Sequence, residues 1–336
     1  SHGYVIVSSP CYGQFSPEVS KDVQGAETQL RDMAFLMNKC TDYSFIDLNN
    51  IIAAGYSWGG TTATLLACYN SNIEGVISFD GALGFEEYYG TGSSFSAFNA
   101  NNLIVPYLWF MPASEKRTTR LFDFIKYGDL SMIRINGIRH SDFSSDRIIK
   151  KKLISPTKET ENGYLSDVYV SLCESVLDFS ENIFSAESGI CLAIEEGSNE
   201  FIKRNAEIIV KRKQPLPPTE NEFLGIIRER GTREAVRIFS EIRDADSTAC
   251  FFSETVLTGF AYEYGPERAQ ELIDLMQMNI KVYPLSVESM LWLVQAYMAL
   301  DRYDEAWKHL GKIRLLEPEN EKALKLSEML RSIVEK

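Results

Sequence analysis

The chain of 336 residues is poor in positive charge, with 34 Lys and Arg against 47 Asp and Glu and a formal net charge of −13. Nucleic-acid binding needs cations that replace phosphate counterions, and anionic lipid attracts basic segments, so this balance argues against both classes of partner. A long apolar run is also missing. The longest stretch without a charge, Tyr88 to Ser114, is interrupted by Gly, Ser, Asn and Pro, whereas a membrane-spanning helix needs about 20 predominantly apolar residues.

Cysteine and histidine are scarce and scattered. The chain has 3 histidines and 6 cysteines. The cysteines are Cys11, Cys40, Cys68, Cys173, Cys191 and Cys250. None forms a C-x-x-C pair or has a histidine at zinc-site spacing, so we predict buried free thiols and no metal site. No phosphate loop or dinucleotide fingerprint is present, and we predict no cofactor. The localisation stays open.

The sequence begins without an initiator Met. Ser1-His2-Gly3 leads directly into an apolar, strand-like run from Tyr4 to Ser8. We therefore expect a piece of a longer protein, in which any signal peptide is unobservable rather than absent.

Residues 1–185 alternate strand-like and helix-like segments. Apolar runs predict strands at Tyr4–Ser8, Asn50–Gly55, Gly75–Phe79, Leu103–Phe110 and Met132–Ile135. Helical spacing predicts helices at Glu27–Lys39, Thr61–Tyr69 and Tyr164–Phe184. Strands separated by helices or long loops are typical of an α/β fold with a doubly wound, mostly parallel sheet.

The composition changes after residue 185. We expect residues 186–219 to form a linker, helical over Lys203–Lys213 and broken at Gln214–Pro218. Residues 220–336 are expected to form a separate all-α domain. Helices are predicted there at Phe223–Arg230, Arg233–Arg243, Ser253–Tyr264, Pro266–Val282, Val287–Leu300, Tyr303–Leu316 and Glu319–Val334.

The all-α part has one internal period. Pro284 and Pro318 lie 34 residues apart, which is the tetratricopeptide period, and Tyr297 and Ala306 then fall at packing positions of the repeat. The region resembles tetratricopeptide-like helical hairpins, with a fair match ending at Pro318 and a degenerate one ending at Pro284. The resemblance implies a groove for a protein partner, or self-association. The alternative is a helical cap that packs on the first domain or on a second chain.

The string Gly55-Tyr56-Ser57-Trp58-Gly59-Gly60 lies between a predicted strand and a predicted helix. In this context G-x-S-x-G is typical of a nucleophile elbow, a sharp turn whose glycines let the serine hydroxyl stand above the sheet. The N-terminus of the following helix stabilises developing negative charge. We predict Ser57 as a nucleophile; the alternative is a packing turn with an incidental serine.

A serine nucleophile needs a base, and the scarcity of histidine narrows the choice. His2 lies at the start of the chain and His309 in a predicted helix of the all-α part. His140 follows the last predicted strand, from which a loop can reach a serine across the strand ends. His140 is therefore the predicted base.

Two acids compete to orient that histidine. Asp80 ends the third predicted strand, and Glu115 follows the fourth, where many hydrolases of this architecture carry the acid. We expect Asp142, beside the histidine, to be a loop charge or a cap. The residues alone leave Asp80 and Glu115 open.

A wider pattern surrounds these residues. Arg31-Asp32 lies in the helix before the elbow, Leu48-Asn49-Asn50-Ile51 leads into it, and Ser78-Phe79-Asp80-Gly81 and His140-Ser141-Asp142-Phe143 follow it. The run from Glu27 to Phe143 thereby resembles the platelet-activating-factor acetylhydrolase and dienelactone-hydrolase-like branch of the α/β-hydrolase family. That branch takes its acid from the earlier strand, so the resemblance favours Asp80. A serine instead of the cysteine of true dienelactone hydrolases implies ester hydrolysis.

The resemblance also implies an acyl-enzyme mechanism. His140 takes the proton of Ser57, Asp80 holds His140, and the backbone N–H of Trp58 donates to the oxyanion. A second donor normally comes from the loop after strand three. We do not find it, because His2-Gly3 leaves no room for the helix that must follow such a loop. We therefore expect strands one to three upstream of residue 1, and an isolated chain that is a poor enzyme.

Residues around the predicted strand ends give few indications of a pocket. Eight aromatics could line an acyl site or belong to the core: Phe85, Tyr88, Tyr89, Phe95, Phe98, Tyr107, Trp109 and Phe110. The segment Glu86–Asn102 is long and rich in Gly, Ser and Asn, and we interpret it as a lid or entrance loop.

Two functions from different classes follow. The first is a serine hydrolase of small carboxylic esters that carries a helical interaction module; a peptidase of the same fold would differ from it only in the pocket. The second is a catalytically vestigial scaffold whose helical repeats bind a protein partner. The presence of Ser57, Asp80 and His140 at matching places favours the first.

Overall fold

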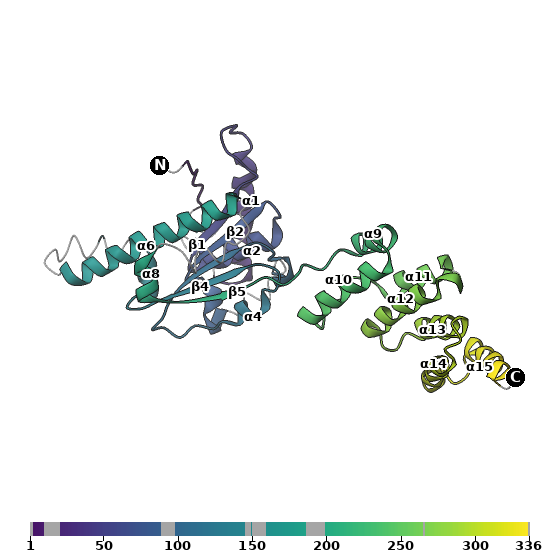
Figure 1. The fold of residues 1–336 in the computed structure, drawn as a ribbon. Coiled ribbons are helices and arrows are strands. Elements are labelled where there is room, and N and C mark those ends of the chain that lie inside the picture. Colours follow the sequence, from purple (N-terminus) through teal and green to yellow (C-terminus); the bar gives the residue numbers. More distant parts are fainter. Residues whose placement is uncertain are drawn as a thin grey trace. The chain divides into compact units, whose positions relative to one another are not determined.

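The computed structural model describes residues 3–9, 21–88, 98–144, 149, 159–185, 199–264 and 266–334. The chain divides into two compact units, Ser1–Gln214 (unit 1) and Pro215–Lys336 (unit 2). Figure 1 shows strands together with helices in the former and helices alone in the described part of the latter.

Unit 1 is built on a five-stranded sheet. Its strands are β1 (Ile51–Tyr56), β2 (Ile73–Phe79), β3 (Tyr107–Pro112), β4 (Leu130–Ile135) and β5 (Ala206–Lys211). They lie in the order β1-β2-β3-β4-β5, the first four parallel and β5 antiparallel to β4. The predicted α/β class with a mostly parallel sheet is confirmed.

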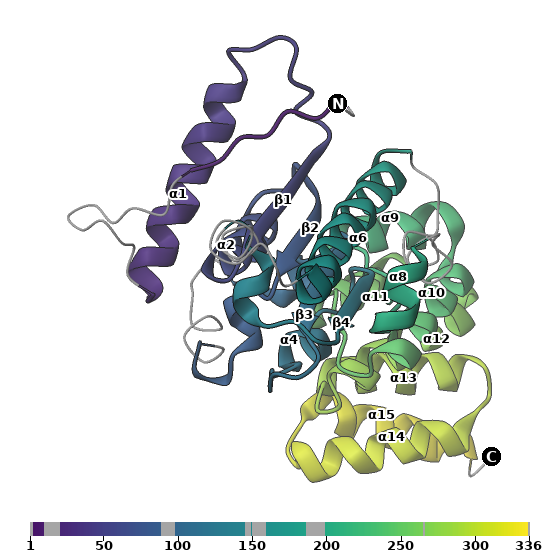
Figure 2. The ribbon, with the colours of Figure 1, turned by 90° about the vertical axis from the view of Figure 1, so that its left-hand side faces the viewer.

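Both faces of the sheet are buried around its central strands, because successive apolar side chains of a strand point to opposite faces. On β3, Tyr107, Trp109 and Met111 belong to one core, which α1 (Val23–Cys40) and α2 (Trp58–Tyr69) complete. Leu108 and Phe110 belong to the other core, with α6 (Glu159–Phe184) and α8 (Glu200–Asn205). Figure 2 shows α1 and α6 on different sides of the strands. A strand buried on both faces reads as a continuous apolar run, as Tyr107–Pro112 does.

The register brings the carboxyl ends of the parallel strands together. Tyr56 of β1 is paired with Phe79 of β2, and Phe79 with Phe110 of β3, which in turn pairs with Ile133 of β4. The turns that leave these strands therefore start side by side at one edge of the sheet, which is where open α/β sheets bind their ligands.

The predicted strand at Tyr4–Ser8 is wrong. The sheet contains no strand from these residues, and the side chains from Tyr4 to Val7 are 40% to 90% exposed. The run has the β-branched composition of a strand, but a strand is held by ladder hydrogen bonds and a buried face. Neither is present for this segment among the residues that the structure describes.

The predicted linker is wrong over residues 199–214. The sequence predicts a helix over Lys203–Lys213, but the helix α8 ends at Asn205 and β5 follows directly. Ile208 and Ile209 point to opposite cores of the sheet. Pairing with the edge of β4 satisfies the backbone and buries these side chains, which outweighs the helical charge pattern.

Unit 2 is a series of helices packed in succession. They are α9 (Glu220–Arg230), α10 (Thr232–Ala245), α11 (Glu254–Glu263), α12 (Ala269–Val282), α13 (Val287–Ala299), α14 (Tyr303–Leu316) and α15 (Glu321–Val334). A capping box starts α9, where Thr219 and Glu222 satisfy each other's backbone N–H groups. The predicted helical hairpins of this region are confirmed.

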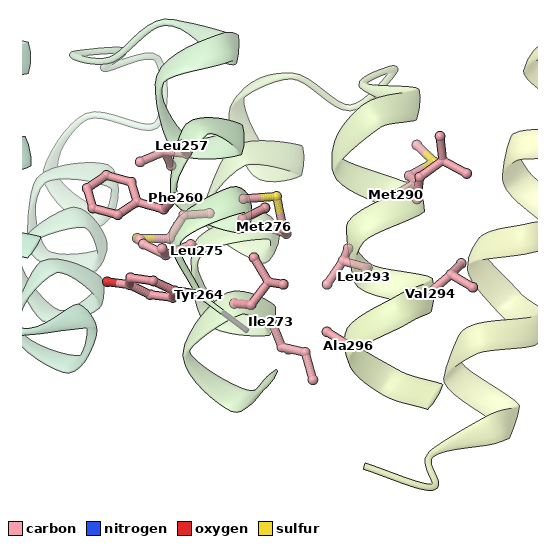
Figure 3. Close-up of a cluster of buried hydrophobic side chains, with 14 of the residues drawn as sticks. Leu257, Phe260, Tyr264, Ile273, Leu275, Met276, Met290, Leu293, Val294 and Ala296 are labelled. Atoms are coloured by element: carbon pink, nitrogen blue, oxygen red, sulfur yellow. The ribbon is translucent and has the colours of Figure 1, made fainter. Parts of the chain in front are cut away.

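One apolar core joins the helices of unit 2. Figure 3 shows Ile273 and Met276 of α12 beside Leu293 of α13. Tyr297 and Ala306, which the period placed at packing positions, are 3% and 0% exposed. The repeat spacing therefore located the contacts between α13 and α14.

We expect the core of unit 1 to respond steeply to truncation at Ile133, which is fully buried. The Ile133→Ala substitution should cost about 2–5 kcal/mol, because a cavity adds to the lost transfer free energy. The matched control is Ile104→Ala, at a position 47% exposed, with an expected cost within about 0.5 kcal/mol. Calorimetry of the whole chain measures both, and equal shifts in Tm would contradict the assignment of Ile133 to the core.

Candidate active site

Turns at one edge of the sheet carry the candidate residues of unit 1. Ser57 follows β1 directly, Asp80 follows β2 directly, Glu115 lies in the turn after β3, and His140 begins a 3-10 helix, η3 (His140–Phe143), after β4. Four segments far apart in the sequence thus meet because their strands are neighbours.

Ser57 sits in a strained backbone conformation. Its φ of 55° and ψ of −118° lie in a region that non-glycine residues rarely occupy. Two backbone hydrogen bonds hold it there: the Ser57 N–H donates to the carbonyl of Phe79 (3.0 Å), and the Ala82 N–H donates to the carbonyl of Ser57 (2.9 Å). Strain fixed by its surroundings is typical of functional sites.

Two glycines make this turn possible. A Cβ at Gly55 would overlap the carbonyl of Gly59, and a Cβ at Gly60 would lie 2.7 Å from Ser78 Oγ and 2.8 Å from Gly81 Cα. Gly59 has open space instead, with nothing within 4 Å of a built Cβ. The steric requirement therefore falls on Gly55 and Gly60, and the second glycine of the G-x-S-x-G string is not part of it.

The His140 ring lies between Ser57 and Asp80. Its Nε2 is 3.0 Å from Ser57 Oγ, and its Nδ1 is 2.7 Å from Asp80 Oδ2. The tautomer that satisfies both contacts carries the proton on Nδ1, so the ring donates to Asp80 and accepts from the Ser57 hydroxyl. The structure thus brings together the three residues predicted as nucleophile, base and acid, with the imidazole between the serine and the carboxylate.

Asp80 is completely buried, with 0% of its side chain exposed. It also has a positive φ of 46°, and its N–H donates to the carbonyl of Phe110 (2.7 Å). A carboxylate without water must be paired and hydrogen-bonded. Besides His140, Arg117 donates to both of its oxygens, from Nε (2.8 Å) and from Nη2 (2.7 Å).

Arg117 was not predicted from the sequence. Its side chain is only 6% exposed. Burial lowers the pKa of the Arg117 guanidinium, but the hydrogen bonds to Asp80 and Glu115 outweigh it, so that the pKa is raised overall. The sequence contains the charge cluster Glu115-Lys116-Arg117 just after β3, but this cluster does not indicate which of its two cations reaches Asp80.

Glu115, the alternative acid, does not touch the imidazole ring in this arrangement. Its Oε1 accepts from the backbone N–H of His140 (3.1 Å), and its Oε2 accepts from Arg117 Nη2 (2.5 Å). Asp142 caps η3, because its Oδ2 accepts from the Arg139 N–H (2.9 Å). The acid next to the ring is Asp80.

Aromatic side chains enclose the imidazole. The Tyr56 ring stacks on His140 at 4.8 Å between centroids, and the Phe85 ring meets it edge-on at 5.2 Å. Burial raises the pKa of Tyr56, with the negative charge of Asp80 as a further cause. Phe143 is also buried, 6.4 Å from Phe79. The Tyr56 and Phe85 rings thus cover two sides of the imidazole, and 29% of the His140 side chain stays exposed.

The aromatics considered for a pocket separate into different groups. Tyr107, Trp109 and Phe110 are 0% to 1% exposed and belong to the cores, and Phe85 lies on His140. Tyr89 and Phe95 lie outside the described residues, as does most of the segment predicted to be a lid. In that segment, Ala100–Asn102 form a short 3-10 helix, η2.

Trp58, the predicted oxyanion donor, begins α2 immediately after Ser57. The first N–H groups of a helix point toward its N-terminus, where the helix dipole adds positive potential. Of the alternative His2-Gly3, His2 lies outside the described residues, and Gly3 is exposed. The position of Trp58 is consistent with the predicted role, which stays a prediction.

The described parts of the chain contain neither a candidate metal site nor a candidate membrane span. There, no three His, Cys, Asp or Glu side chains cluster as they would around a metal ion. In the same residues, no helix combines the length and hydropathy needed to cross a membrane.

No protein-family model and no curated protein matches the chain. Solved tetratricopeptide-repeat domains are similar to about a third of it. The second such domain of human RPAP3, solved with an HSP70 peptide, has 17% identity and a TM-score of 0.24 over 33% of this chain and 90% of its own. The domain of Arabidopsis OM64 has 18% identity and a TM-score of 0.24 over 34% of this chain and 91% of its own. The first domain of Spaghetti (RPAP3), bound to an HSP90 peptide, has 17% identity and a TM-score of 0.24 over 35% of this chain and 90% of its own.

The two neighbouring glycines after Ser57 allow a matched test of the turn. We expect Gly60→Ala to destabilise unit 1 by about 1–3 kcal/mol, because the new methyl group meets the backbone of Gly81. Gly59→Ala should be neutral or stabilise by up to about 1 kcal/mol, since alanine favours a helix. Thermal unfolding of both variants measures the difference. Equal destabilisation would show that the close approach at Gly60 is not what requires glycine.

Proposed function

We propose that the chain is a serine hydrolase that cleaves carboxylic esters, with an α/β-hydrolase fold related to the platelet-activating-factor acetylhydrolase and dienelactone-hydrolase-like branch. The observation that carries the proposal is the hydrogen-bonded series Ser57–His140–Asp80 at the carboxyl edge of a mostly parallel sheet. The strained backbone of Ser57 between a strand and a helix supports it further.

In the proposed reaction, Ser57 Oγ attacks the carbonyl carbon of the ester while His140 Nε2 takes the hydroxyl proton. The negative charge that develops on the carbonyl oxygen is met by the N–H of Trp58 and the N-terminus of α2. Collapse of this intermediate breaks the bond to the alcohol, which leaves with the proton from His140. Water then attacks the acyl-enzyme by the same path, and the acid leaves.

Asp80 has two tasks in this scheme. Its carboxylate accepts a hydrogen bond from the Nδ1–H of His140, which leaves Nε2 unprotonated and directed at Ser57. When His140 takes the serine proton, the ring becomes positive, and the buried carboxylate stabilises that charge at close range. The scheme needs no cofactor, and its predicted substrate is a small molecule with a carboxylic ester.

A fluorophosphonate probe tests the nucleophile. It should label the wild-type chain, because an activated serine displaces fluoride from phosphorus, and Ser57→Ala should abolish the labelling. Ser185→Ala, at an exposed serine after α6, is the matched control and should be labelled like wild type. Labelling that survives Ser57→Ala would contradict the assignment.

Hydrolysis of p-nitrophenyl acetate tests the acid. Asp80→Asn should lower kcat by about 10³–10⁴, because the amide favours the wrong tautomer of His140. Glu115→Gln should lower it far less, since Glu115 contacts only the backbone of that residue. A larger loss in Glu115→Gln than in Asp80→Asn would reverse the choice between the two acids.

The second candidate function is a scaffold whose catalytic site is vestigial and whose helices bind a protein partner. Its support is a set of large apolar side chains left exposed on unit 2: Tyr262 at 74%, Leu285 at 71% and Leu315 at 86%. The partner proposed is a peptide segment, the class of ligand held by the human RPAP3 and Spaghetti domains. Absence of Ser57 labelling in the folded chain would favour this candidate over the hydrolase.

A further inference from the structure

A cluster of three charged side chains lies on the Nδ1 side of the His140 imidazole. Asp80 is 0% exposed, Arg117 6% and Glu115 30%. Arg117 Nη2 donates to both carboxylates, and its Nη1 donates to the carbonyl of Lys116 (3.1 Å). Every nitrogen of the guanidinium is therefore engaged within the protein. Such an arginine is not placed to receive a substrate anion, and its role must be sought in what it holds.

The Arg117 guanidinium is also held in one orientation. Arg117 Cζ lies 3.9 Å from the centroid of the Phe85 ring, and the same ring meets the His140 ring edge-on. Arginine suits this place because its planar fork binds a carboxylate with two nitrogens while its face stacks on an aromatic ring. Arg117 thus contacts two side chains that themselves contact the imidazole, Asp80 and Phe85.

The cluster also sets the electrostatic balance around the base. Arg117 shares Asp80 Oδ2 with His140 Nδ1, so its positive charge opposes protonation of the ring. Glu115 opposes the effect of Arg117 from the other side and ties the backbone of His140 to the same cation. Two carboxylates and one guanidinium leave one net negative charge in the cluster.

We propose that Arg117 and Glu115 are positioning residues that act through Asp80 and the His140 backbone and tune the base in opposite directions. The inference deepens the proposed hydrolase function and rests on it. Neither residue touches the reacting atoms in this proposal. Arg117 fixes the Asp80 carboxylate and weakens its stabilisation of the protonated imidazole, and Glu115 restores part of that stabilisation.

Other charged or titratable groups surround His140 and stay unchanged in the variants below. Those on other elements are Tyr56 at the end of β1 and Tyr169 on α6, and those beside it are Arg139 and Asp142. Because these groups are common to all variants, they give no reason for shifts of opposite sign.

The test compares Arg117→Met, Arg117→Lys and Glu115→Gln by the pH profile of kcat/KM on p-nitrophenyl acetate. Arg117→Met should move the midpoint of the acid limb upward by roughly one pH unit or more, because loss of a neighbouring cation favours the protonated ring. Glu115→Gln should move it downward, because an anion is lost. Arg117→Lys should keep the midpoint close to that of wild type but lower kcat, since the charge stays and the bidentate geometry goes.

The matched control is Arg134→Met, which removes a surface ion pair with Glu207 (2.9 Å) in the same unit. Its midpoint should equal that of wild type. A merely structural role for the cluster would lower thermal stability without displacing the midpoint, or would displace it in one direction for both substitutions, and either result overturns the inference. Should Arg117→Met fail to fold, Glu115→Gln and Arg117→Lys decide alone, and an unmoved midpoint in Glu115→Gln overturns it.

Failure of the proposed function is recognised separately. If the folded wild-type chain is not labelled at Ser57, the hydrolase proposal falls; slow turnover of the ester alone does not overturn it, because the isolated chain is expected to be a poor enzyme. The NMR titration of the His140 ring protons, in a chain with 3 histidines, still reads the cluster without any turnover. Midpoints displaced in opposite directions by Arg117→Met and Glu115→Gln support the inference, and coincident midpoints overturn it.

Discussion

The carboxylate of Asp80 has no access to water, and the candidate site is organised around that fact. A charge buried to this degree is tolerated only with an opposite charge and a full set of hydrogen bonds. His140 and Arg117 supply them. Because these two residues come from different turns, the need to satisfy one carboxylate draws the loops after β3 and β4 together over the end of β2.

The sheet brings these loops close to one another. Its parallel strands start their turns at the same edge, and the two cores that cover its faces hold the strands in register. Two non-glycine residues with positive φ, Ser57 and Asp80, lie at this edge, and hydrogen bonds to neighbouring strands hold both. The strain is therefore local, whereas the structure that maintains it extends through unit 1.

Much of the architecture could be predicted because it depends on short-range patterns. Apolar runs located β1 to β4, and the proline period located the helical hairpins around Tyr297 and Ala306. What failed depends on partners remote in the sequence. The run Tyr4–Ser8 has the composition of a strand but no neighbouring strand in the sheet, and Ala206–Lys211 reads as helical until the free edge of β4 is known.

The candidate site divides in the same way. Ser57 could be proposed from its turn and His140 by elimination, since histidine is rare. Strand position alone did not separate Asp80 from Glu115, because both follow strands; the separation comes from which side chain reaches the ring. Arg117 could not be chosen among 34 Lys and Arg, because its role is defined by a contact 37 residues back along the chain.

The open space around Gly59 bears on how such turns are recognised at all. The usual five-letter string scores the glycine two places after the serine, yet in this chain the close approach to the neighbouring turn occurs one place later, at Gly60. A sequence with another small residue at 59 could thus form the same turn and escape a search for the string. For distant relatives, a pattern anchored on positions 55 and 60 would follow the geometry more faithfully than one anchored on 55 and 59.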